Sequence, residues 1–217
     1  NISSNIGGTG DWRTSFYGDG SNAQLASIDP NMQYNGHATL RYDLPGGMSR
    51  LPELWPSLPR NLSTLWLRAK IRFGPGFTTT GTLTNSSNAY KMLGWGLAGV
   101  DGSGRLEITN TTQYDLYWGA TTTTGTTVVP NTDQGGGPQI RTEWSDGKWY
   151  DYIIEYEITS PTTAVARFWL AEDGQPPVLQ MTRTRTAASG FTMPAFPSVM
   201  LGLHFNQVRT STQSQQL

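Results

Sequence analysis

The chain has 217 residues, of which 36% are hydrophobic and only 14% are charged, and its formal net charge is −1. A near-neutral chain without a basic run lacks the charge pattern of a nucleic-acid-binding protein, and no apolar run is long enough for a membrane span. With no cysteine and two histidines, the sequence excludes disulfides and thiolate metal sites and predicts no metal and no cofactor.

The length predicts one domain, residues 1–217, with a sizeable core. Within it we expect a loop-rich N-terminal part at 1–60, a core sandwich at 61–209, and a polar tail or truncated last strand at 210–217. Much of the chain is Ser, Thr, Asn, Gln and Gly. This composition is typical of a β-protein that works outside the cell, so we expect a secreted or cell-surface location.

Alternation of apolar and polar side chains predicts the strands. They are expected at 37–43, 65–73, 90–97, 105–108, 114–118, 149–158, 164–171, 178–185 and 199–206. The prolines of 51–60 exclude a central strand there. Residues 101–104 are expected to form a turn, since they offer too few ligands for a calcium loop. Residues 119–139 are expected to form a surface loop, in which 126–129 could be an edge strand.

About ten short strands separated by Gly, Pro and Asn turns, without a helical period, predict an all-β fold. We expect an antiparallel β-sandwich or jelly roll of two curved sheets.

Three stretches carry a resemblance to a known superfamily. They are a tryptophan-led strand at 149–155, its partner and chain reversal at 166–174, and the late strand at 201–206. Together they resemble the concanavalin A-like lectin and glucanase superfamily, and within it are most similar to bacterial polysaccharide lyase-like jelly-roll modules. The resemblance implies that 90–97, 114–118 and 199–206 line an oligosaccharide groove on a concave sheet, and that 149–158 belongs to the convex sheet.

The catalytic motifs of the superfamily are incomplete in this chain. The Glu-x-Asp-x-x-Glu strand motif of its glucanases is missing. The Gln-Ile-His strand of alginate lyases is echoed only by Gln139-Ile140-Arg141, where arginine replaces the histidine that would act as base.

His204, Asn206 and Gln207 lie close together near the end of the late strand. Histidine is the side chain most readily poised for proton transfer at neutral pH. His204 could therefore be the base of a lyase, with an amide against the substrate carboxylate and Tyr90 or Tyr114 as proton donor. The alternative is a hydrogen-bonded strand residue in a non-catalytic groove.

Aromatic and cationic side chains supply the other candidate ligand contacts. Trp95 and Trp118 could stack on sugar rings, and ordinary core packing is the alternative. Lys91 and Arg141 could bind uronate or sulfate groups, with solvated surface charge as the alternative. The complete set of expected ligand-binding residues is Lys91, Trp95, Trp118, Arg141, His204, Asn206 and Gln207.

Asp151, Glu155 and Glu157 share one strand face and could form a hydrolytic pair. We favour instead surface ion pairing with Arg167 across the hairpin.

The leading hypothesis is an extracellular module that binds a polysaccharide or oligosaccharide, acidic or neutral, in a concave groove. A polysaccharide lyase that cleaves a uronic-acid polymer by β-elimination is the first alternative, ahead of a glycoside hydrolase. A structural or assembly protein with a lectin-like sandwich is the second. The sequence leaves open whether the protein is an enzyme.

Overall fold

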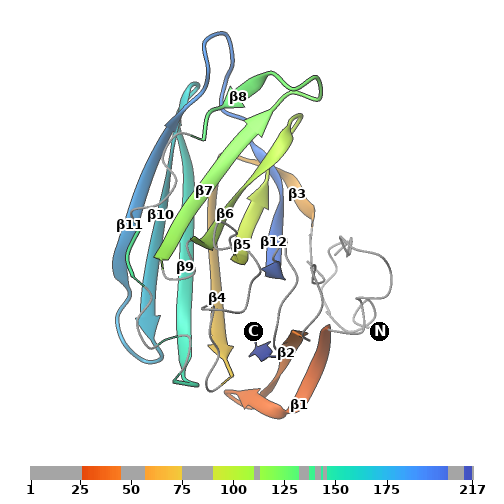
Figure 1. The fold of residues 1–217 in the computed structure, drawn as a ribbon, viewed down its shortest axis with the longest axis vertical. Helices are drawn as coiled ribbons and strands as arrows, with labels where there is room; N and C mark the ends of the chain where they lie inside the picture. Colours follow the sequence, from red (N-terminus) through yellow and green to blue (C-terminus); the bar gives the residue numbers. More distant parts are fainter. Residues whose placement is uncertain are drawn as a thin grey trace.

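The computed structural model describes residues 26–44, 57–74, 90–109, 113–131, 137–139, 143, 146–204 and 213–216, and the figures refer to these. The described residues form antiparallel strands and their connections, arranged as two sheets face to face (Figure 1). Among them there is no helix that could cross a membrane. The predicted all-β sandwich is therefore confirmed.

The first sheet has seven strands in the order β1-β2-β13-β4-β9-β10-β11. Their bounds are β1 Ala26–Tyr34, β2 His37–Leu44, β13 Gln213–Gln216, β4 Thr64–Phe73, β9 Trp149–Ser160, β10 Thr163–Glu172 and β11 Val178–Thr186. The short strand β13 lies between β2 and β4. Residues 213–216 of the expected polar tail thus form a strand.

The second sheet has six strands in the order β3-β12-β5-β6-β7-β8. Their bounds are β3 Ser57–Leu62, β12 Phe196–His204, β5 Tyr90–Gly96, β6 Asp101–Thr109, β7 Gln113–Thr121 and β8 Thr127–Val129. The three segments expected to line the groove, in β5, β7 and β12, do share this sheet, and β9 belongs to the other one. The proline-containing β3 lies at the edge, as expected.

Two expectations about the second sheet need correction. Residues 101–104 are not a turn but the first half of β6, paired with β7 from Asp101↔Thr121 onward. These residues are strand because they pair with β7 and, from Ser103 on, with β5, and glycine is needed at 104 because a Cβ there would overlap the indole of Trp95. The expected loop at 119–139 begins with strand, since residues 119–121 belong to β7, whereas the edge strand considered at 126–129 is confirmed by β8 at the edge of the sheet.

Aromatic rings from both sheets form the centre of the core. Tyr156 of β9 has its ring centroid 5.0 Å from that of Trp95 and 5.0 Å from that of Trp118, and 4.8 Å from that of Phe196. All four side chains are completely buried. These spacings are the ones at which aromatic pairs attract, so the two sheets are joined by direct ring contacts.

Candidate functional site

The outer face of the six-stranded sheet carries a row of charged residues across β5, β6 and β7. In the strand register, Glu107 lies opposite Lys91 on one side and opposite Asp115 on the other. Directly opposite residues of antiparallel strands share a face of the sheet. Leu106 and Leu116, the alternate neighbours, are completely buried in the core. The row of Lys91, Glu107 and Asp115 therefore lies on the outer face.

A β-bulge in β5 decides which face Lys91 takes. The pairing of β5 with β6 shifts between Lys91 and Leu93, and Met92 and Leu93 are both completely buried. A bulge adds one residue to a strand and thereby reverses the alternation beyond it. Strict alternation predicts Lys91 and Trp95 on one face, whereas in the structure Trp95 points into the core and Lys91 joins the outer row.

Arg105 is held in a fixed position beside this row. Its Nε donates a hydrogen bond to Glu107 Oε2 at 2.7 Å, and Nη1 donates to Ser103 Oγ at 3.1 Å. Its guanidinium carbon lies 3.8 Å from the ring centroid of Tyr117 on β7. A guanidinium has five N–H donors in a rigid fork, so these two bonds orient the group and engage only part of its donor capacity.

The carboxylates of the row are buried and electrostatically coupled. Burial raises the pKa of Glu107 above its usual value, and the charges of Arg105 and Lys91 act in the opposite direction, whereas that of Asp115 adds to the rise. Asp115 is completely buried, and its Oδ1 lies 3.4 Å from Nη2 of Arg183 on β11. The row is thus anchored by ion pairs rather than solvated.

A groove of about 370 Å³ lies next to Arg105, over β6, β7 and β8. Polar side chains dominate its lining, and they include Ser103, Arg105, Tyr117, Thr121, Thr127 and Asn131. Hydroxyl, amide and guanidinium groups donate hydrogen bonds to sugar hydroxyls and carboxylates. The size is within the range of small-ligand sites, so the groove can hold part of an oligosaccharide.

The structure places some of the sequence-predicted residues in the same sheet as the groove. The backbone of His204 in β12 lies opposite Lys91 of β5, and Tyr90 begins β5. The side chains of His204 and Tyr90 are not among those described. Three further predicted contacts lie outside the described residues altogether, namely Arg141, Asn206 and Gln207.

Tyr114 lies on the core side of β7, away from the groove. Its hydroxyl donates a hydrogen bond to Glu143 Oε1 at 3.1 Å and lies 3.1 Å from the hydroxyl of Tyr152. Burial raises its pKa well above the usual value, and the neighbouring Tyr152 and Glu143 act in the same direction. This position does not suit the expected role as proton donor to a ligand on the outer face.

Trp95 and Trp118 are completely buried between the sheets. Their ring centroids lie 6.3 Å apart in an edge-to-face arrangement. Core packing, the alternative to sugar stacking, is therefore what the structure shows for both indoles, because neither ring is exposed on the outer face.

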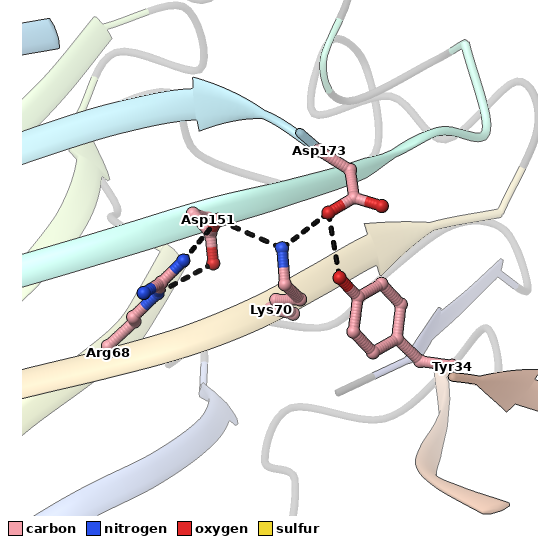
Figure 2. A network of polar contacts seen from close by, with 5 residues as sticks. All are labelled: Tyr34, Arg68, Lys70, Asp151 and Asp173. Atoms are coloured by element: carbon pink, nitrogen blue, oxygen red, sulfur yellow. Dashed lines mark hydrogen bonds and ion pairs between the residues drawn. The ribbon is translucent and has the colours of Figure 1, made fainter. Parts of the chain in front are cut away.

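The carboxylates of β9 lie on the outer face of the other sheet and are paired. Arg167 Nη1 lies 2.5 Å from Glu155 Oε2 and 3.5 Å from Glu157 Oε2. The expectation of ion pairing with Arg167 across the hairpin is confirmed for Glu155 and Glu157. Asp151 pairs instead with Arg68 and Lys70 of β4, in a network of ion pairs and hydrogen bonds on this sheet (Figure 2).

Sequence reasoning missed four residues of the site, which are Arg105, Glu107, Asp115 and Tyr117. A usable signal was present, since Arg105 and Glu107 alternate with apolar residues in a segment already expected to be a strand. The local pattern could not show which residues lie beside Arg105 and Glu107, because these belong to other strands and are set by register.

Comparison with family models gives no match, and neither does comparison with curated protein sequences. Solved structures do match. A PL-14 alginate lyase from Aplysia kurodai aligns with a TM-score of 0.57 at 12% identity, over 90% of this chain and 85% of that one. The endo-β-1,4-glucuronan lyase of Trichoderma reesei aligns with a TM-score of 0.54 at 14% identity, over 97% and 90%.

A mutant of alginate lyase Aly36B in complex with alginate tetrasaccharide also matches, with a TM-score of 0.53 at 12% identity over 95% of this chain and 90% of that one. At such identities the likeness is one of fold. The chain has the concanavalin A-like jelly-roll fold, which it shares with these alginate and glucuronan lyases.

Proposed function

We propose that this protein binds a polysaccharide of uronic acids along the outer face of the six-stranded sheet, in the groove beside Arg105. The observation that carries the proposal is the oriented Arg105, fixed by Glu107 and stacked on Tyr117 at the wall of an open polar groove. An oriented guanidinium can bind a carboxylate through two parallel N–H donors, which gives both strength and direction.

Two further observations support an acidic ligand. Lys91 lies in the same row as Glu107, next to the site, and adds a second cation to this face. Three structural neighbours with TM-scores above 0.5 are lyases of alginate or glucuronan, which are uronic-acid polymers. A polymeric ligand of this kind is met outside the cell, and we therefore propose an extracellular location.

Affinity electrophoresis through gels containing alginate or glucuronan tests the proposal. The wild-type protein is expected to be retarded, and Arg105→Gln is expected to lose most of this retardation because the oriented donors are removed. Arg68→Gln is the matched control, since Arg68 is also a strand arginine paired with a carboxylate but lies on the other sheet. Circular dichroism confirms that both variants fold.

Equal mobility of wild-type protein in gels with and without these polymers would sink the proposal. So would equal losses of retardation in Arg105→Gln and Arg68→Gln, because the effect would then not depend on the groove.

A lyase is the second candidate, favoured by the register that sets His204 opposite Lys91. In β-elimination, a base removes the C5 proton of a uronate, the C4–C5 double bond forms, and the O4 leaving group departs with a proton from an acid. In this proposal His204 is the base, and Lys91 and Arg105 stabilise the charge that develops on the substrate carboxylate.

The unsaturated product of this reaction absorbs in the ultraviolet, so incubation with alginate, glucuronan and glycosaminoglycans is a direct assay. Product formation that is lost in His204→Ala supports the lyase. Silence with every polymer that the protein binds identifies a binding module instead.

A further inference from the structure

The outer face of the seven-stranded sheet carries an exposed apolar surface, separate from the groove. Trp66 of β4 and Trp169 of β10 stack across β9, with ring centroids 5.1 Å apart and planes at 27°. Leu179 of β11 lies opposite Trp169 in the strand register. Trp66 is 58% exposed and Leu179 is 50% exposed. We call these three residues the tryptophan platform.

The cations around the platform, Arg68, Lys70 and Arg167, are all paired with carboxylates. Arg167 pairs with Glu155 at 2.5 Å and also lies 3.5 Å from Glu157. Arg68 donates to both oxygens of Asp151, from Nε at 3.0 Å and from Nη2 at 2.8 Å. Figure 2 shows Arg68 and Lys70 directed at the shared Asp151 carboxylate. A ligand on the platform therefore meets polar hydrogen-bonding groups whose cations already have carboxylate partners, which disfavours an acidic ligand there.

The exposed apolar area is small. A tryptophan side chain has about 250 Å² of surface at most, so an exposed fraction of 58% leaves about 150 Å² at Trp66. A stable protein interface buries about 800 Å² on each partner. Trp66 therefore offers the area of a single stacked ring, far below that of a protein contact.

We propose that the tryptophan platform is a second glycan-binding site, which stacks a pyranose ring of an uncharged polysaccharide on the exposed indole of Trp66. A pyranose presents a flat face of C–H groups, which matches the π-face of an indole. The paired Arg167 and Glu155 beside the ring supply donors and acceptors for its hydroxyl groups. Because the two sheets are packed face to face, this site and the groove lie on opposite sides of the molecule.

This site does not depend on the function proposed for the groove. The protein would bind a neutral chain on one face and an acidic chain on the other, and could thereby connect two kinds of polysaccharide.

Affinity electrophoresis in three neutral polymers tests the inference, with soluble mixed-linkage β-glucan, xylan and galactomannan as probes. We expect retardation of the wild-type protein by at least one of them and an affinity about tenfold lower for Trp66→Ala, the change that loss of one stacked ring produces. Trp66→Phe, which keeps a ring, is expected to retain part of the affinity.

Val178→Ala is the matched control. Val178 is 59% exposed, but it lies opposite Leu170 in the register and not in the row of the platform. It is expected to bind like wild type. Retardation by alginate is measured in parallel and should survive Trp66→Ala, so a failure of the platform is distinguishable from a failure of the groove.

Three outcomes would overturn the inference. The first is unchanged mobility of wild-type protein in all three neutral polymers. The second is equal retardation of wild type and Trp66→Ala. The third is self-association, measured by sedimentation velocity, that Trp66→Ala abolishes. The platform would then bind a second copy of the chain rather than a glycan.

Discussion

Gly104 of β6 is the position where one added methyl group should disturb both the core and the groove. It lies opposite Trp95 on β5 and opposite Trp118 on β7. A Cβ built at Gly104 comes closer than 3.0 Å to three atoms of the Trp95 indole, namely Cε2, Cζ2 and Nε1. The indole has little room to retreat, because it is completely buried and packed against Tyr156.

Gly104→Ala is therefore an overpacking mutation, and such changes cost about 1–3 kcal/mol. We expect a value near the top of that range, about 3 kcal/mol, because the obstacle is a rigid double ring. Urea denaturation at equilibrium measures the loss as a lower midpoint at unchanged slope. Since Ser103 and Arg105 flank the glycine and face the groove, retardation by alginate should weaken as well.

Gly119→Ala is the matched control. Gly119 is a strand glycine on the neighbouring β7. Its added Cβ meets the Tyr117 hydroxyl at 3.5 Å and the Val129 carbonyl oxygen at 3.6 Å, which are ordinary contacts, and Asn131 Cβ at 3.2 Å, which is slightly tight. These neighbours can shift slightly, so we expect a change below about 1 kcal/mol. If Gly104→Ala cost no more than Gly119→Ala, the packing of Trp95 against β6 would be refuted.

Two further predictions concern stability. Trp95→Ala should lower the free energy of unfolding by about 3–5 kcal/mol, and Trp66→Ala by about 1 kcal/mol or less. Urea denaturation measures both losses. Losses of similar size would contradict the assignment of Trp95 to the core and Trp66 to the surface. For Asp151, burial raises the pKa, but hydrogen bonds and charges from Arg68 and Lys70 outweigh it, so the pKa is below its usual 3.8. The stabilisation is present above that value and lost as the pH falls through the lowered pKa. Asp151→Asn should thus be less stable than wild type at neutral pH, and this difference should shrink in acid; a difference independent of pH contradicts the ion-pair network.

Local pattern was sufficient for most strands and for the class of fold. The alternation in 149–158 and 164–171 predicted the hairpin of β9 and β10, and with it the pairing of Arg167 with Glu155. The resemblance to the superfamily also assigned the strands expected at the groove to one sheet and 149–158, which is β9, to the other. Such features are readable because side-chain alternation is a property of each strand by itself.

Local pattern failed where two strands interact irregularly. Strict alternation places Lys91 and Trp95 on the same face of β5, but the bulge places them on opposite faces. Asp101–Gly104 contains two glycines and resembles a turn, yet it is strand because it pairs with β7, and Gly104 leaves space for the indole of Trp95. In both cases the deciding contact lies on another strand.

The sequence pointed to the sheet that carries the candidate site, but, apart from β7, not to the strands and residues that line its groove, which lies over β6, β7 and β8. The sequence directed attention to β5, β7 and β12, and register now sets Lys91 opposite His204 in that sheet. The sequence left open whether Trp95 and Trp118 lie at the groove or in the core. Their complete burial is a property of the assembled sandwich. The groove that Arg105 and Tyr117 line was not foreseen.

The sequence by itself determined that this protein is an all-β sandwich without disulfides, because composition, turn residues and alternation are local and need no partner. Only the tertiary structure decided that Glu107 lies between Lys91 and Asp115, that Arg105 is fixed above Tyr117, and that Trp66 meets Trp169. Each of these contacts joins different strands, and the register between strands is set by the packing of the whole sheet.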